Sequence, residues 1–257
     1  MEFLYTADRN SYRRMTTSEL RKAYMVDETF KPGEVTLCYT DIDRAIVGSA
    51  VPLADPLTLP IHKELASDFF AQRREIGVVN IGAAGKVEVD GETFEVDNRD
   101  SLYIGRGSQD IRFSSDSADD PAKYYLVSYP AHTEYPTKLV RMADANRVEL
   151  GSLETSNERV IHQSICPGIV ETCQIVLGFT QLAPGSVWNT MPPHTHRRRT
   201  EIYMYFDLDD DSAVFHLMGE QDETRALVVR NGEAVVSPTW SLHSGAGTCA
   251  YTFVWAM

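Results

Sequence analysis

Short runs of β-branched and aromatic residues, separated by turn residues, follow one another from residue 33 to the end of the chain. The clearest case is 86–96, where two alternating segments flank Asp90-Gly91, a dipeptide typical of a tight hairpin turn. The other predicted strands are 35–39, 44–48, 76–81, 174–182, 201–208, 212–218, 226–229, 235–237 and 251–255. Regular short strands of this kind are typical of sandwiches and barrels, so we expect an all-β fold.

The first thirty or so residues lack this strand pattern. The segment Thr16-Thr17-Ser18-Glu19-Leu20-Arg21-Lys22 resembles a helix start, with Thr16 or Thr17 as the N-cap and Glu19 in the first turn. Lys31-Pro32-Gly33 then interrupts the pattern. We therefore expect a short helical arm over residues 1–32.

One segment of the first half can be laid over one of the second. Residues 99–110 and 232–243 both contain an acidic turn, an apolar strand, a Gly or Pro bend and a polar tip. A repeat of this kind favours two similar β-domains in tandem, which we place at 33–140 and 141–257.

Charge and composition exclude several classes of partner. The chain carries 37 acidic against 24 basic residues, a formal net charge of −13. Such a balance argues against nucleic acid and anionic membranes as partners. No stretch approaches the roughly 18 apolar residues of a membrane span, and no secretory signal is present. The four cysteines form no CxxC pair, so we expect reduced thiols and a cytoplasmic protein.

The strongest chemical signal is Pro192-Pro193-His194-Thr195-His196, followed by Glu201 after three arginines and a threonine. In a strand, positions i and i+2 share a face, so both imidazoles can point to one place. A turn through 197–200 would bring Glu201 from the next strand. His243, after the Pro238 bend, is the natural fourth ligand. Three imidazoles and a carboxylate suit zinc, manganese or iron. The remaining histidines have no partner at ligand spacing, and we expect them on the surface or hydrogen-bonded in the core: His62, His132, His162 and His216.

This pattern resembles the cupin signature, in which HxH and a glutamate are followed by a second block ending in histidine. Gly232, Pro238 and His243 fall on the positions of that second block. Trp240 replaces its second glycine and Gly247 its asparagine, and the glycines of the first block are displaced or absent. The departures concern loop shape more than metal binding. The resemblance implies two tandem jelly-roll barrels.

Several longer segments resemble one bicupin family, the 4-deoxy-L-threo-5-hexosulose-uronate ketol-isomerases, also called 5-keto-4-deoxyuronate isomerases. They are YRRMTTSEL (12–20), IVGSAVP (46–52), FFAQRREIG (69–77), YIGRG (103–107), YPTK (135–138) and PHTHRR (193–198). The family's members extend by a short tail past the positions matching 251–257, so this chain is either a shorter member or a truncated one.

The resemblance implies one Zn²⁺ per chain on His194, His196, Glu201 and His243. It implies a homohexamer and the interconversion of 5-dehydro-4-deoxy-D-glucuronate and 3-deoxy-D-glycero-2,5-hexodiulosonate in pectin or polyuronide breakdown. A cupin dioxygenase and a non-catalytic sugar-binding cupin are the alternatives. A phosphorylated substrate fits less well, because no Gly-rich phosphate loop is present.

The base and the substrate contacts are less constrained. The general base is unassigned; Glu220, Glu171 and a metal-held hydroxide are candidates. A substrate carboxylate needs a cation, which Arg197, Arg198, Arg199, Arg159 or Arg225 could supply. In the first half Asp110 takes the place of His243 and no HxH precedes it, so we expect a scaffold or contact domain without metal.

Overall fold

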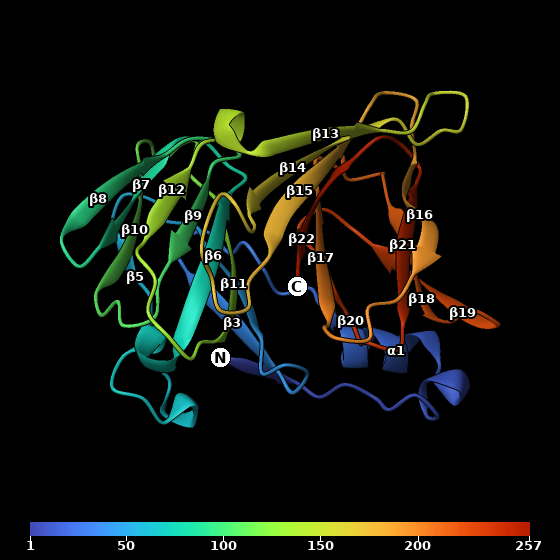
Figure 1. Cartoon of the computed structure of the whole chain (residues 1–257), viewed down its shortest axis with the longest axis horizontal. Helices are drawn as coiled ribbons and strands as arrows, with labels where there is room; N and C mark the ends of the chain where they lie inside the picture. Colours follow the sequence, from blue (N-terminus) through green and yellow to red (C-terminus); the bar gives the residue numbers. More distant parts are fainter.

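The computed structural model describes all residues 1–257 and contains four β-sheets in two pairs (Figure 1). In the first pair, the seven-stranded sheet has the order β1 (Glu2–Leu4), β3 (Val35–Thr40), β4 (Ile46–Ala50), β11 (Tyr124–Pro130), β6 (Arg74–Asn80), β9 (Ser101–Ile104), β12 (Lys138–Val140). Its four-stranded partner has the order β5 (Leu57–Thr58), β10 (Ile111–Ser115), β7 (Gly85–Val89), β8 (Glu92–Val96).

The second pair repeats this plan. Its seven-stranded sheet has the order β13 (Asn146–Leu150), β14 (Arg159–Ile165), β15 (Leu177–Leu182), β22 (Thr252–Ala256), β17 (Glu201–Phe206), β20 (Ala234–Ser237), β2 (Met25–Val26). The four-stranded sheet has the order β16 (Trp188–His194), β21 (Leu242–Gly247), β18 (Val214–Glu220), β19 (Glu223–Val229). The all-β prediction of two tandem cupin-type barrels is confirmed. The predicted repeat of 99–110 and 232–243 is also present. In the two pairs of sheets, β9 and β20 occupy matching places, and so do β10 and β21.

The helical elements are few and lie at the ends and loops. They are α1 (Thr17–Tyr24) and the 3₁₀ turns η1 (Tyr12–Arg14), η2 (Lys63–Leu65), η3 (Phe70–Arg73) and η4 (Met142–Asp144). None of them combines the length and the hydropathy that a membrane-spanning helix requires.

The hairpin predicted from Asp90-Gly91 is β7–β8, with Val89 paired to Glu92. Both turn residues have positive φ, 51° for Asp90 and 86° for Gly91. A two-residue turn of this kind matches the right-handed twist of the strands that it joins.

Apolar side chains form three cores. One cluster fills the first barrel and another, which includes α1, fills the second. The largest, of 23 buried residues, takes side chains from both seven-stranded sheets, which face each other in the middle of the molecule (Figure 1). Burial is continuous along β4, β6 and β17, as expected for strands whose sheets are covered on both faces.

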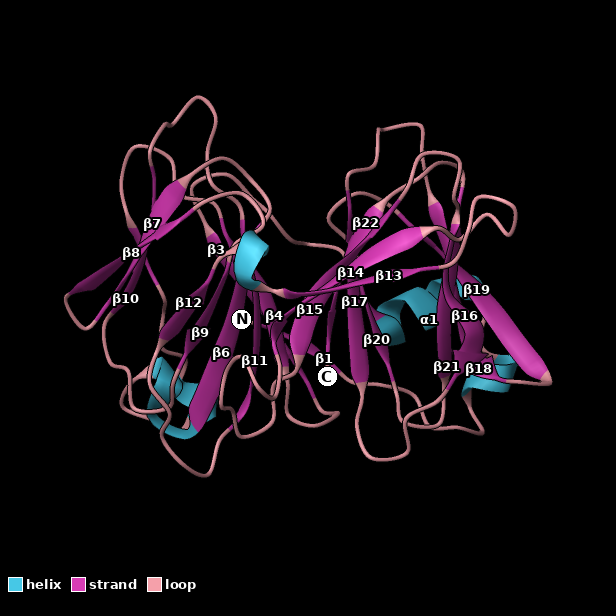
Figure 2. Cartoon of the chain, turned by 45° about the horizontal axis from the view of Figure 1, so that its top comes forward, coloured by secondary structure: helices cyan, strands magenta, loops and turns pink.

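The N-terminal arm joins the two halves. Thr16 caps α1, and its side chain and that of Glu19 form the reciprocal capping box. The helix lies against the second half (Figure 2), where Arg21 donates to the carbonyl of Val228 and to the Glu233 carboxylate. By contrast, β1 pairs in parallel with β3 of the first half.

Sheet membership changes between β12, which ends at Val140, and β13, which begins at Asn146. On this basis we propose the division into 1–32, 33–140 and 141–257. The arm precedes the first domain in sequence, but its strand β2 pairs with β20 and completes the sheet of the second domain.

Candidate metal centre and pocket

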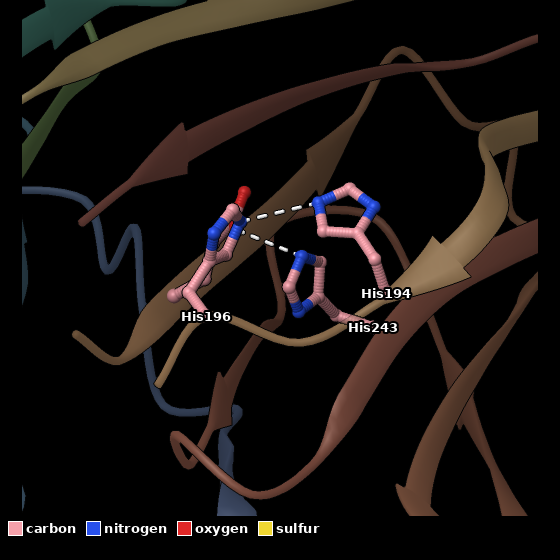
Figure 3. A group of neighbouring side chains, drawn as sticks. His194, His196 and His243 are labelled. Atoms are coloured by element: carbon pink, nitrogen blue, oxygen red, sulfur yellow. Dashed lines mark hydrogen bonds and ion pairs between the residues drawn. The ribbon is translucent and has the colours of Figure 1, made fainter. Parts of the chain in front are cut away.

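Four side chains from three separate segments converge at one end of the second barrel. One ligand atom from each of His194, His196, Glu201 and His243 lies within 4.8 Å of the others. Figure 3 shows the three imidazoles turned toward a common point.

Strand pairing explains how these residues meet. His194 ends β16 and pairs directly with His243 near the start of β21. Glu201 begins β17, the strand that follows the 197–200 turn. His196 lies in the loop after β16 rather than in a strand, so it reaches the cluster from a turn and not by strand alternation as predicted. The two prolines before His194 are tolerated because β16 is an edge strand.

The ligand atoms already have the spacing of a coordination shell. Oε2 of Glu201 lies 3.0 Å from Nε2 of His196 and 2.8 Å from Nε2 of His243. Nε2 of His194 lies 3.2 Å from Nε2 of His196. Ligands around tetrahedral zinc are about 3.3 Å apart. Both Oε2 of Glu201 and Nε2 of His243 are buried and lack a hydrogen bond of proper direction. Atoms that crowd together without bonding one another fit a shared cation between them.

The protonation states also fit a metal. Nδ1 of His194 lies 3.2 Å from the carbonyl oxygen of Pro192, which can only accept, so Nδ1 carries the proton and Nε2 offers its lone pair. Burial lowers the pKa of His194, which favours the neutral ring. Burial raises the pKa of Glu201, but the neighbouring imidazoles of His196 and His243 outweigh it and lower the pKa to about 2. The carboxylate is therefore ionised at neutral pH.

A cavity of about 440 Å³ opens over the cluster. Leu150, Ile161, Phe253 and Trp255 form apolar parts of its wall. The polar side chains beyond the cluster are Arg159, Gln163, Thr180, Thr190, Arg199 and Tyr203. Its size and mixed lining suit a small polar ligand with a few oriented contacts.

Only some of the arginines predicted to bind the substrate carboxylate lie at the cavity. Arg159 and Arg199 line the cavity, whereas the exposed Arg197 and Arg198 do not. Arg225 instead holds the N-terminal arm, donating to the carbonyls of Tyr12 and Met15. Alternation along a run does not apply here, because Arg197 and Arg198 lie in a turn and Arg199 in the loop that follows it.

The two predicted base candidates lie outside the cavity lining. Glu220 pairs with Arg9 and Arg13 of the N-terminal arm. Glu171 is exposed on the loop before β15. Glu201 is thus the only acidic side chain that lines the cavity.

Sequence reasoning missed four polar residues of the wall: Gln163, Thr180, Thr190 and Tyr203. A signal for Tyr203 existed, since it follows Glu201 by two positions in one strand. None existed for Thr190, which lies in the irregular part of β16. His216, which was expected in the core or on the surface, is fully buried and hydrogen-bonded to Tyr205 and Ser237.

Comparison with known proteins gives a consistent result. The model of the KduI/IolB family matches residues 24–257. The 4-deoxy-L-threo-5-hexosulose-uronate ketol-isomerase of Lachnoclostridium phytofermentans is 52% identical over 257 residues, 100% of this chain and 93% of that protein. The protein of the same name from Formosa agariphila is 50% identical over 256 residues, 100% of this chain and 91% of its own length.

Solved structures share the fold at low identity. An IolB-like protein from Salmonella typhimurium LT2 superposes with a TM-score of 0.71 at 14% identity, covering 91% of this chain and 92% of that chain. A Bacillus subtilis oxalate decarboxylase gives a TM-score of 0.57 at 10% identity, covering 83% and 68%. These likenesses concern the fold.

Proposed function

The chain belongs to the KduI/IolB family, and we propose that it is a zinc-dependent ketol-isomerase that interconverts 5-dehydro-4-deoxy-D-glucuronate and 3-deoxy-D-glycero-2,5-hexodiulosonate. The observation that carries this proposal is the convergence of three imidazoles and one carboxylate beneath a cavity that also contains a buried arginine. The relatives at 52% and 50% identity bear the name of this reaction.

The reaction converts an α-hydroxy aldehyde into an α-hydroxy ketone. One proton moves between two adjacent carbons and another between the two oxygens that they carry. His194, His196, Glu201 and His243 would hold a divalent metal, which supplies a Lewis acid for those oxygens. The apolar wall of the cavity limits the access of water to the reacting atoms.

Arg159 is the residue that we assign to the substrate carboxylate. It is 9% exposed, forms no ion pair and makes a single hydrogen bond, from Nη1 to the carbonyl of Asn157. Burial lowers its pKa. A buried cation without a counter-ion is costly, and a carboxylate ligand would relieve that cost through bidentate hydrogen bonds. Arg199 lines the same cavity and offers a second, half-buried cation.

The first experiment follows isomerisation of 5-dehydro-4-deoxyuronate by NMR, before and after removal of metal with a chelator. We expect turnover that is lost with the metal and restored by zinc more fully than by manganese or iron. Absence of turnover with metal bound would contradict the proposed function. Oxygen consumption would instead indicate a cupin dioxygenase, and saturable sugar binding without turnover a binding protein.

Substitution of Arg159 tests the carboxylate contact. For Arg159→Gln we expect KM to rise about 10- to 100-fold, since a charged hydrogen bond contributes about 1.5–3 kcal/mol. Arg198→Gln is the matched control, because that side chain lies outside the lining of the cavity. An unchanged KM in Arg159→Gln would contradict this assignment and leave Arg199 as the cation that binds the substrate carboxylate.

Assembly as a homohexamer and a cytoplasmic location stay predictions. Light scattering coupled to size-exclusion chromatography would test the first, with six times the 28.8 kDa chain mass as the expected result.

A further inference from the structure

Two hydroxyl groups meet in the cavity beside the metal cluster. Oγ1 of Thr190 and the phenolic oxygen of Tyr203 are 2.8 Å apart, and both residues line the cavity. Tyr203 follows Glu201 by two positions in β17, so the two side chains leave the strand on the same face. Its ring packs edge-on against that of His243, with centroids 5.5 Å apart. The hydroxyl pair therefore belongs to the surroundings of the ligand atoms.

The backbone at Thr190 is unusual. Its φ is 43°, and it is the only β-branched residue among those with positive φ. Left-handed backbone is strongly disfavoured for β-branched side chains, and such conformations gather at functional sites. Thr190 lies where the pairing of β16 with β21 is interrupted, between Asn189 and His194. At this irregularity its hydroxyl is hydrogen-bonded to Tyr203.

The hydrogen-bond count leaves the pair with unused capacity. Two hydroxyls contain two O–H groups, and the single bond between them uses one, with either oxygen able to donate. The second O–H makes no other hydrogen bond of good geometry, and the carboxylate of Glu201 is a competing acceptor for it. Elsewhere in the wall, Thr180 accepts from Trp255 and Gln163 accepts from Asn146. The pair can thus offer one donor and one acceptor at once.

We propose that Thr190 and Tyr203 are catalytic residues that bind the carbonyl and the neighbouring hydroxyl of the substrate and pass the oxygen-bound proton between them. This inference rests on the proposed isomerase function. A substrate that presents one acceptor and one donor on adjacent carbons matches the donor and acceptor of the pair. After isomerisation the two substrate oxygens have exchanged roles, and reversal of the hydrogen bond between Thr190 and Tyr203 matches the new arrangement.

The transfer balances without any further reactant. The O–H bond of the substrate hydroxyl breaks, and its proton goes to one hydroxyl of the pair. The shared proton crosses to the other hydroxyl, whose own proton forms the new O–H bond on the former carbonyl oxygen. Both side chains are neutral before and after, and nothing in the pair is oxidised or reduced.

The test compares variants that remove one hydroxyl at a time. Thr190→Val keeps the β-branched shape, Thr190→Ser keeps the hydroxyl, and Tyr203→Phe removes the phenol. Tyr205→Phe is the matched control, because Tyr205 is the next buried tyrosine on the same face of β17 but bonds to His216 outside the cavity lining. For each variant kcat and KM are measured for the uronate, and bound metal is quantified by mass spectrometry.

We expect Thr190→Val and Tyr203→Phe to lower kcat about 100-fold with KM changed less than about threefold, as for loss of a group that acts in the transition state. Metal content stays at the wild-type level in both. Thr190→Ser and Tyr205→Phe retain activity, and the double variant is no slower than the worse single one, because the pair acts as a unit.

Retention of kcat in Thr190→Val and Tyr203→Phe would overturn the inference. So would a loss in Thr190→Ser as large as that in Thr190→Val, since shape and not the hydroxyl would then matter. Should Tyr203→Phe fail to fold, the comparison of Val with Ser at position 190 decides alone. Absence of turnover in the wild type would overturn the proposed function and this inference with it.

Discussion

Glu201 is the residue on which the centre depends most, because it combines deep burial with ionisation. Its exposed fraction is 5%, and its carboxylate oxygen Oε2 touches two imidazole nitrogens. A buried charge of this kind is stable only when a cation or hydrogen-bond donors surround it. The geometry therefore predicts the effect of replacing the carboxylate by an amide, as in Glu201→Gln.

For Glu201→Gln we expect bound metal to fall well below one per chain. The kcat should fall at least about 100-fold, since even outer-shell partners of metal sites contribute 10- to 100-fold. Mass spectrometry of the metal and NMR of turnover measure the two effects. Glu220→Gln is the control, as its partners Arg9 and Arg13 lie on the arm. Equal losses in both variants would contradict the assignment.

His216 makes a second prediction at this scale, because it is buried as a neutral ring. Burial lowers its pKa from 6.5 to about 3. Between these values the unfolded chain binds a proton that the folded chain does not. The contribution of His216 to the free energy of unfolding is therefore constant above pH 6.5 and falls as the pH is lowered from 6.5 toward 3.

Urea unfolding of wild type and His216→Gln from pH 8 to about pH 5 tests this sign. The variant should lose part of the slope below pH 6.5, up to about 1.4 kcal/mol per pH unit. Above that pH the two curves should run parallel, which provides an internal control. An identical slope throughout would mean that His216 takes up its proton in the folded state.

The hairpin β7–β8 shows how a single element follows from local sequence. Alternation sets the faces of its strands, and Asp90-Gly91 supplies the two positive φ values of the turn. A Cβ at Gly91 would meet no atom within 4 Å, so space is not limiting there. Only the backbone conformation, with φ of 86°, requires glycine.

Gly91→Ala should consequently destabilise the protein by roughly 1–2 kcal/mol through backbone strain alone. Gly91→Asn should cost less, because asparagine tolerates left-handed backbone. Thermal or urea unfolding measures both, and equal stability of all three proteins would refute the account.

At the scale of the whole molecule, Glu75 links the two halves. It is fully buried in β6, and its carboxylate accepts from the backbone N–H groups of Cys173, Gln174 and Ile175 at 2.6–2.9 Å and from the hydroxyl of Tyr103 at 2.7 Å. This segment leads into Val176, which lines the cavity. The first barrel thus helps to position one wall of the centre in the second.

Glu75→Gln replaces one acceptor oxygen by an NH₂ group and leaves at least one buried backbone N–H without a partner. We expect a loss of about 1–3 kcal/mol in unfolding free energy and a raised KM. Glu95→Gln, which removes only an exposed pair with Lys86, should leave the unfolding free energy close to the wild-type value. A wild-type KM in Glu75→Gln would show that Glu75 does not help to position the cavity wall.

Local patterns were sufficient for many of the strands, though not for β11 or β14. They also predicted the capping box at Thr16, the hairpin turn and the grouping of HxH with Glu201, because each depends on residues close in sequence. His243 was proposed as the fourth ligand from its place after the Pro238 bend, and the family resemblance added the reaction. What the chain's periodicity does not encode is which distant strands lie side by side. The contact of His194 with His243 arises from the pairing of β16 with β21, and Arg159 reaches the cavity only because β14 closes the same barrel. Thr190 joins Tyr203 through a backbone irregularity that no local pattern predicts. These positions depend on closure of the sheets, whose favourable contacts form between segments far apart in the chain.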